Sequence, residues 1–230
     1  MNSQLVRKEV MERMLNMITE NKQDLIHELA ALRTKHITVV LENIYQSHNA
    51  SAVIRSCDCF GVQDVHVIAD KKKYEVNREV AMGAGKWVTT HHYPNQNTKA
   101  CLEKLKLAGY KVIATSPHAT QKLSELTIDC PIAMVFGTEK DGLSNDALEM
   151  ADEVVSIPMY GFTESFNISV SAALTLNTLR EKLMTSNIDW KLTEDDLVEL
   201  KIDWCKNILY KGKEVYLQVV KDVENTFTNV

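Results

Sequence analysis

The chain has 230 residues, of which 45% are hydrophobic and 25% charged, enough to bury a sizeable core in one large domain with helical additions. Its formal net charge of −5 argues against a protein that coats nucleic acid without specificity, because that binding depends on phosphate neutralisation by Lys and Arg. No stretch approaches the roughly 18 consecutive apolar residues of a membrane span. We therefore expect a soluble, cytoplasmic protein without a secretory signal.

The five cysteines are odd in number and scattered, and only Cys57 and Cys59 lie close together. This pattern favours reduced thiols over a disulfide framework or a metal site. His91 and His92 are adjacent, so on a strand they would point to opposite faces. We therefore expect no metal.

Residues 3–32 carry apolar positions three to four apart, which predicts one or two amphipathic helices. A β-branched run at residues 36–43 predicts a strand, and residues 49–61 then resemble a helix closed by Gly61. Asn49 is a natural N-cap of that helix. Arg55 follows Asn49 by six residues and is turned about 240° from it on an ideal helix, so spacing alone does not bring the two together.

The alternation of strands and helices continues along the chain. Strands are expected at residues 65–69, 110–116, 132–137 and 153–158, and helices at 98–109, 145–151 and 167–183. Such alternation predicts an α/β fold with a parallel sheet covered on both faces. Ligands bind such sheets at the carboxyl ends of the strands, where residues 114–117, 136–142 and 156–161 fall.

The tail from Thr193 is again helical in pattern, and Thr193 with Asp196 forms an S/T-x-x-D start. We expect an N-terminal helical extension at residues 1–35, a catalytic domain at 36–185 and a C-terminal helical extension at 186–230. If RNA is the substrate, its site must be a local basic patch. The candidates, each of which could also be an ordinary solvated face, are Arg7, Lys8, Arg13, Arg33, Lys35, Lys71, Lys72 and Lys73.

Three segments place glycine, carboxylate, amide or hydroxyl groups where a strand ends. They are ENIYQSHNASAVIR at residues 42–55, MVFGTEKDGLS at 134–144 and SIPMYGFTESFNISVS at 156–171. Gly137 and Gly142 permit a close backbone approach to a ligand, although both also suit ordinary turns. Ser165 or Asn167 could cap the last helix, but capping alone does not explain the whole polar string.

Together, in order and spacing, these three segments resemble the motifs of the SpoU methyltransferases, which belong to the SPOUT class. The first motif is similar to NASAVIR, the second to FGTEKDGLS and the third to IPMYGFTESFNISVSAA, and the resemblance covers roughly residues 36–183. The terminal helices resemble the extensions with which tRNA-modifying members of the family hold tRNA. The resemblance therefore implies an RNA ribose 2′-O-methyltransferase, with the D-loop guanosine of tRNA favoured as acceptor.

The same resemblance implies a deep C-terminal trefoil knot in the sheet and a homodimer. It also implies that S-adenosylmethionine lies bent in the knot. The cofactor residues carried over from the family are Thr115, Gly137, Ile157, Met159, Ser165 and Ile168. The absence of a G-x-G-x-x-G fingerprint after the first strand agrees with such a pocket.

For catalysis, the resemblance assigns Arg55 as the residue that activates the 2′-hydroxyl, assisted by an RNA phosphate. Asn49, Glu139, Ser165 and Asn167 would arrange the site, and His48 and Arg55 would contact RNA. A free guanidinium hardly ever loses its proton. An equally good hypothesis is that Arg55 stays cationic, binds phosphate and stabilises the developing alkoxide.

Several alternatives stay open. Relatives also modify ribosomal RNA or tRNA anticodons, and the sequence does not identify the RNA. A SpoU-like RNA-binding protein without catalysis is a rival of another class, which is disfavoured by the presence of Arg55, Glu139, Ser165 and Asn167. A nicotinamide dehydrogenase would need the glycine fingerprint that this chain lacks.

Overall fold

The computed structural model describes residues 3–44, 46–69, 81–138 and 140–228. The chain divides into two compact units. One unit contains residues 34–190, and the other combines the two terminal segments, up to Arg33 and from Lys191 onward. No helix of the described segments is long and apolar enough to cross a membrane.

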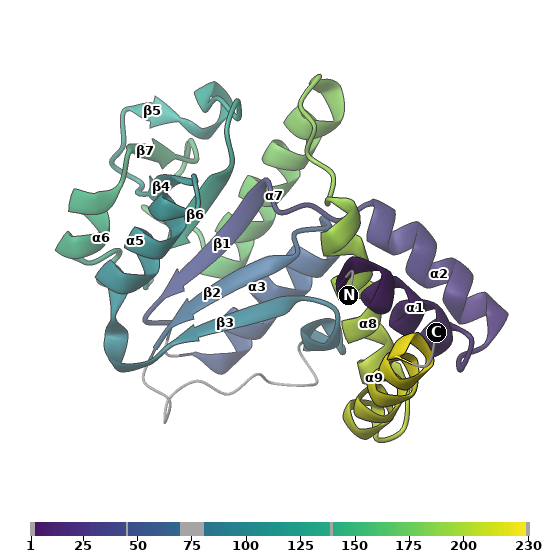
Figure 1. Cartoon of the computed structure of the whole chain (residues 1–230). Coiled ribbons are helices and arrows are strands. Elements are labelled where there is room, and N and C mark those ends of the chain that lie inside the picture. Colours follow the sequence, from purple (N-terminus) through teal and green to yellow (C-terminus); the bar gives the residue numbers. More distant parts are fainter. Residues whose placement is uncertain (1–2, 45, 70–80, 139, 229–230) are drawn as a thin grey trace. The chain divides into compact units, whose positions relative to one another are not determined.

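The larger unit is built on a parallel sheet with the strand order β3-β2-β1-β6-β4-β7-β5 (Figure 1). All of its strand pairs are parallel. The strands are β1 (Ile37–Glu42), β2 (Asp64–Ile68), β3 (Thr89–Tyr93), β4 (Lys111–Thr115), β5 (Gln121–Lys122), β6 (Ile132–Phe136) and β7 (Glu153–Ser156). The predicted parallel α/β fold is therefore confirmed.

Side chains alternate between the two faces of this sheet, as the period of a strand requires. In β1, Val39 and Leu41 join one core cluster, whereas Val40 joins the other. Helices α3 (Ser47–Cys59) and α7 (Ile168–Thr185) supply the first cluster, and α5 (Thr98–Leu107) and α6 (Asn145–Met150) supply the second. Both faces are covered, which is why β1, β2 and β6 are buried along their whole length.

The sheet order places β6 between β1 and β4, although β6 follows both of them in the chain. From β1 the chain adds β2 and then β3 on one side, as far as an edge of the sheet, and it then crosses to the other side of β1 to form β4. This reversal creates the kind of position where ligands bind in open parallel sheets. The trefoil knot that the resemblance implies stays a prediction.

Two strands and several short helices were not expected from the sequence. Strand β3 carries half-buried polar residues, and β5 has only two residues, so neither produces the apolar run that predicts a strand. The short helices are η1 (Ala84–Lys86), η2 (Pro94–Gln96) and η3 (Leu123–Glu125). The expected glycine stop at Gly61 is confirmed, since this residue has a φ of 73° just after α3, and Gly109 ends α5 in the same way with a φ of 86°.

The smaller unit contains α1 (Ser3–Leu15), α2 (Glu20–Ala31), α8 (Glu194–Ile208) and α9 (Gly212–Thr228). Helices from the two ends of the chain pack together, because α1 contacts both α8 and α9 and α2 contacts α8. As expected, Thr193 caps α8 by accepting a hydrogen bond from the backbone N–H of Asp196. Arg33 is buried, with its guanidinium 5.1 Å from the ring centroid of Trp204, so it is not part of a surface patch.

Candidate functional site

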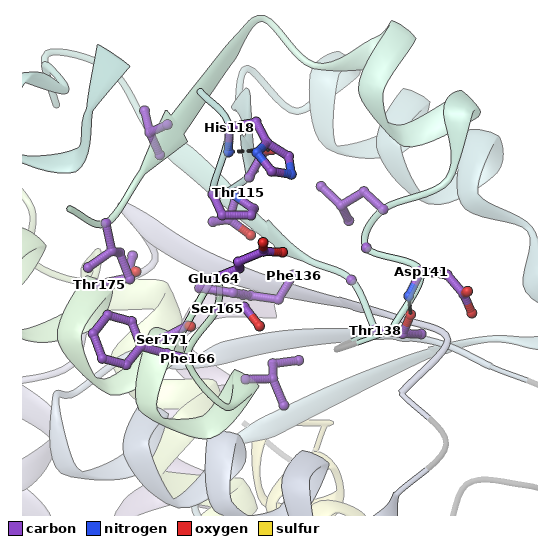
Figure 2. Close-up of a pocket in the computed structure, with 18 of the residues that line it drawn as sticks. Thr115, His118, Phe136, Thr138, Asp141, Glu164, Ser165, Phe166, Ser171 and Thr175 are labelled. Carbon is purple, nitrogen blue, oxygen red and sulfur yellow. Dashed lines mark hydrogen bonds between the residues drawn. The ribbon is translucent and has the colours of Figure 1, made fainter. Parts of the chain in front are cut away.

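A cavity of about 440 Å³ lies at the carboxyl ends of the neighbouring strands β6, β4 and β7. The segment after β4 contributes Thr115 to His118, and the loop after β6 contributes Phe136 to Thr138 and Lys140 to Leu143. The loop after β7 adds Glu164 to Phe166, and α7 adds Ile168, Ser171 and Thr175 (Figure 2). The pocket is therefore formed by three strand-end loops and one helix face.

The loop after β6 is held in a tight, closed shape. Thr138 and Gly142 exchange two backbone hydrogen bonds of 3.0 Å, and Gly142 has a positive φ of 68°. A Cβ atom added to Gly137 would lie 2.2 Å from the carbonyl oxygen of Gly142, a distance that real structures do not allow. Glycine at residue 137 is therefore required by the close packing of the loop on itself.

A buried carboxylate anchors the end of this loop. Glu42, at the end of β1, is 1% exposed and accepts hydrogen bonds from the backbone N–H of Ser144 at 2.9 Å and from its hydroxyl at 2.6 Å. It also accepts one from the Thr98 hydroxyl at 2.5 Å. Ser144 in turn caps α6. Glu42 thus joins the starts of α5 and α6 to β1 beside the pocket loop.

All six residues expected to bind the cofactor line this one cavity. They are Thr115, Gly137, Ile157, Met159, Ser165 and Ile168. They come from three different loops and a helix, so the fold brings together residues up to 53 positions apart, from 115 to 168. The cavity is also lined by four titratable residues that were not predicted from the sequence: His118, Lys140, Asp141 and Glu164. Three of them could have been found from the sequence, because they lie within the quoted motifs: Lys140, Asp141 and Glu164.

Asn49 is not the N-cap of its helix. Helix α3 begins at Ser47, so Asn49 lies inside its first turn and is 2% exposed. Its side-chain amide donates to Oε1 of Gln46 at 2.9 Å, and its Oδ1 accepts from Nδ2 of Asn167 at 3.3 Å. The expected capping role was therefore wrong, because α3 begins two residues before Asn49 and the Asn49 side chain bonds to Gln46 and Asn167 instead.

Asn167 is the cap of α7, and its Oδ1 accepts from the backbone N–H of Ser169 at 2.9 Å. Of the two capping candidates, Ser165 instead faces the cavity. Asn167 therefore both caps α7 and links it to α3. Glu139, the one carboxylate of the expected catalytic set, lies outside the described residues.

Arg55 does not line the cavity. It lies in a separate, shallow groove between α3 and α7, which also includes Val170, Leu174 and Asn177. The cavity is lined by other residues of α7, namely Ile168, Ser171 and Thr175. One face of this helix therefore lines the cavity and another face lines the groove. Within one chain, α7 therefore separates Arg55 from the expected cofactor residues.

The family model described as the SpoU rRNA Methylase family matches residues 36–177. The chain belongs to the SpoU family. This confirms the family that the three motifs predicted. The matched range contains all three motifs and every strand of the sheet.

Individual SpoU relatives match more of the chain. A Borreliella burgdorferi protein named tRNA (guanosine(18)-2′-O)-methyltransferase is 41% identical over 193 residues, which are 84% of this chain and 88% of that protein. The crystal structure of the A. aeolicus TrmH/SpoU tRNA modifying enzyme superposes with a TM-score of 0.73 at 28% identity, over 83% of this chain and 98% of that one.

A second SpoU structure shares the fold at low identity. It is the SpoU methyltransferase AviRb from Streptomyces viridochromogenes in complex with the cofactor AdoMet, with a TM-score of 0.56 and 20% identity. The match covers 70% of this chain and 62% of that one.

The expected RNA-binding cations of this SpoU chain differ in their surroundings. Arg7, Lys8 and Arg13 each form an ion pair, with Glu199 at 3.1 Å, Glu194 at 2.5 Å and Glu9 at 2.7 Å. These carboxylates offset the positive charge on that part of the helical unit. His48 is exposed on the first turn of α3. Lys71, Lys72 and Lys73 lie outside the described residues.

Proposed function

We propose that this chain transfers a methyl group from S-adenosylmethionine to a ribose 2′-hydroxyl of RNA, with the D-loop guanosine of tRNA as the acceptor. The observation that carries the proposal is that all six expected cofactor residues line one cavity. The tRNA acceptor is supported by the 41% identical relative, whose name specifies guanosine 18 of tRNA. The five cysteines are free thiols, in keeping with a cytoplasmic enzyme.

The cavity fits such a cofactor in size and in the groups it presents. Its volume of about 440 Å³ lies in the range of small-molecule pockets. Phe136, Ile157 and Ile168 offer apolar contact for a nucleoside ring, and the side chains of Ser165 and Glu164 offer hydrogen-bond acceptors for polar ends. When bound, S-adenosylmethionine supplies an electrophilic methyl group on its sulfonium. This chain's task would then be to hold the acceptor oxygen in line with that methyl group.

Arg55 is proposed to act on the acceptor side, either by activating the 2′-hydroxyl or by stabilising its developing negative charge. Its guanidinium lies on the exposed face of α3, where an RNA phosphate has access. Phosphate and guanidinium pair through two parallel hydrogen bonds, which would fix the ribose next to them. Asn49 and Asn167 would position the elements that carry Arg55 and the cavity wall.

We propose further that the protein is a homodimer joined through the α3–α7 face. Val170 and Leu174 are 43% and 41% exposed on that face, beside Ala52 and Ala173 in the groove. In a two-fold dimer such a patch meets its own copy and becomes buried. A second copy packed there would also bring a guanidinium toward a cavity that Arg55 of the same chain does not line.

Two measurements test this function. Calorimetry with S-adenosylmethionine and with NAD should show binding of the first alone, and binding of NAD alone would refute the methyltransferase. Incubation of total RNA with labelled cofactor, followed by mapping of the modified nucleotide, should locate the label on a D-loop guanosine of tRNA. Label confined to ribosomal RNA would overturn the tRNA acceptor. Cofactor binding without any transfer would favour the silent RNA-binding protein.

A further inference from the structure

Two aromatic side chains of the loop after β7 extend almost completely into solvent. Tyr160 is 96% exposed and Phe162 is 107% exposed, so neither ring contributes to the core. They flank Gly161, and a Cβ atom added to this glycine would meet nothing closer than the backbone nitrogen of Thr163 at 4.0 Å. The space around the two rings is therefore open.

This loop is continuous with the wall of the candidate cofactor cavity. Met159 immediately precedes the aromatic pair and Glu164 follows it closely, and both line the cavity. The rings are thus carried by the same short segment that borders the site of methyl transfer. Large exposed apolar side chains beside a functional cavity indicate a surface that binds something.

The proposed reaction places a nucleobase near this loop. The ribose 2′-hydroxyl must approach the methyl group directly, and the base is attached to the adjacent carbon of the same ribose. Proteins that act on single nucleotides take the base out of its stack and compensate for the lost stacking with aromatic side chains. Tyr and Phe offer flat rings for this purpose, and stacking on them tolerates any base.

We propose that Tyr160 and Phe162 form a stacking platform for the base of the acceptor nucleotide or its immediate neighbour. This inference rests on the proposed function, and it adds the residues that hold the RNA at the cavity. A second copy of the chain is the competing occupant, but neither ring lines the α3–α7 groove through which the dimer is proposed. The aromatic pair instead lies among Gly161, Thr163 and Glu164, next to the cavity.

The test compares variants that remove the rings with variants that keep them. Tyr160→Leu, Phe162→Leu and the double variant retain apolar bulk but cannot stack, whereas Tyr160→Phe and Phe162→Tyr retain a ring. Leu107→Ala is the matched control, since Leu107 is 90% exposed at the end of α5 and does not line the cavity. Each full-length protein is assayed for binding of unmodified tRNA by fluorescence anisotropy, for S-adenosylmethionine binding by calorimetry and for oligomeric state by ultracentrifugation.

We expect each Leu variant to weaken tRNA binding by about 5- to 150-fold, the range found for the loss of one stacked base. Cofactor binding and oligomeric state should not change, and the ring-retaining variants and Leu107→Ala should bind tRNA like the wild type. Unchanged tRNA binding in the double variant would overturn the proposal. Loss of the dimer would assign the rings to a second copy, and loss of cofactor binding would assign them to the cavity wall. The tRNA-binding assay does not depend on methyl transfer. If the wild-type protein binds tRNA but transfers no methyl group, the proposed function fails while the stacking platform is still tested.

Discussion

Asn167 donates a hydrogen bond from Nδ2 to Oδ1 of Asn49 at 3.3 Å, although the two residues are 118 positions apart in the chain. The bond joins the first turn of α3 to the capping residue of α7. Asn49 is buried, and Ser165 and Ile168 on either side of Asn167 line the candidate cofactor cavity. The pair therefore couples the helix that carries Arg55 to the wall of the cavity.

Substitution of Asn167 should separate its two roles. Asn167→Ala removes the cap and the link, and should lower the free energy of unfolding by about 1 kcal/mol, the usual cost of a lost N-cap. Asn167→Asp keeps a capping oxygen at the positive end of α7 but cannot donate to Asn49. We expect Asp to preserve stability in urea unfolding and to lose methyl transfer as Ala does. Full transfer by Asn167→Asp would show that the link to Asn49 is not needed.

Gly137→Ala should distort the cavity. The added methyl group would lie 2.2 Å from the carbonyl oxygen of Gly142 and 2.6 Å from the backbone nitrogen of Leu143, so the loop must move. We expect a loss of roughly 1–3 kcal/mol in unfolding free energy, as for other overpacked sites. Affinity for S-adenosylmethionine, measured by calorimetry, should fall at least about tenfold, the equivalent of 1.4 kcal/mol.

Gly161→Ala is the control for that change, because its added methyl group has open space. It should leave both stability and cofactor affinity close to the wild-type values. Wild-type affinity in Gly137→Ala would mean that the loop after β6 does not hold the cofactor.

Arg55→Ala and Arg55→Lys should both reduce methyl transfer, by about 10²- to 10³-fold for Ala if the guanidinium stabilises negative charge in the transition state. Lysine lacks the planar fork that pairs with phosphate, so it should restore only part of the rate. The fold of the single chain should be little affected, because Arg55 is exposed on that chain and does not line its cavity.

The pH profile of transfer then distinguishes the two roles of Arg55. A fixed cation leaves the shape of the profile unchanged in the Lys variant, whereas a proton acceptor shifts it. Near-full activity of Arg55→Lys at all pH values would contradict both roles.

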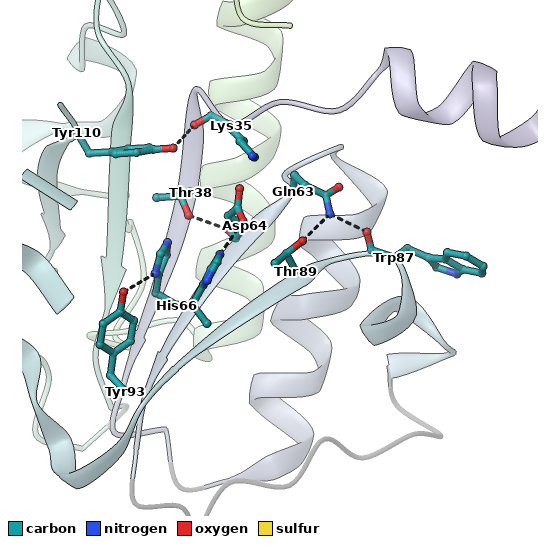
Figure 3. A network of polar contacts seen from close by, with 10 residues as sticks. Lys35, Thr38, Gln63, Asp64, His66, Trp87, Thr89, Tyr93 and Tyr110 are labelled. Carbon is teal, nitrogen blue, oxygen red and sulfur yellow. Dashed lines mark hydrogen bonds and ion pairs between the residues drawn. The ribbon is translucent and has the colours of Figure 1, made fainter. Parts of the chain in front are cut away.

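His66 lies in a polar network between β2 and β3, outside the candidate site (Figure 3). Its ring stacks on His91 with centroids 4.6 Å apart, and Nε2 of His91 lies 2.7 Å from Oδ1 of Asp64. The Tyr93 hydroxyl lies 3.4 Å from Nδ1 of His66. The pKa of His66 is lowered from 6.5 to about 4, mainly by burial and also by the nearby His91, while Asp64 opposes the shift.

This shift predicts that the protein loses stability in mild acid. Between pH 6.5 and pH 4 the unfolded chain protonates His66 and the folded protein does not, so the free energy of unfolding falls as the pH falls. The difference between the two pKa values corresponds to roughly 3 kcal/mol. Urea unfolding across this range should show a shallower pH dependence in His66→Gln than in the wild type. His48→Gln, which changes an exposed histidine, should keep the wild-type slope.

Much of this protein could be predicted from the order of its residues. Alternating strand and helix patterns predicted the parallel α/β fold, since apolar runs of strand length bounded by glycines depend on local chemistry alone. The three motifs predicted the SpoU family, and the resemblance to that family supplied six residues that line a single cavity. Edge strands β3 and β5 escaped prediction because an edge strand needs few apolar residues.

What the tertiary structure decided depends on packing between distant segments. Asn49 has the residue type of a helix cap, but it lies inside α3 and is buried there. Its partner Asn167 is 118 positions away in the sequence, so only packing could bring the two together. In the same way, local spacing could not show that α7 separates Arg55 from the cavity, or that Glu199 and Glu194 pair with Arg7 and Lys8. A motif specifies residue types and local geometry. The direction in which each side chain points is set by the helices and strands that pack around it.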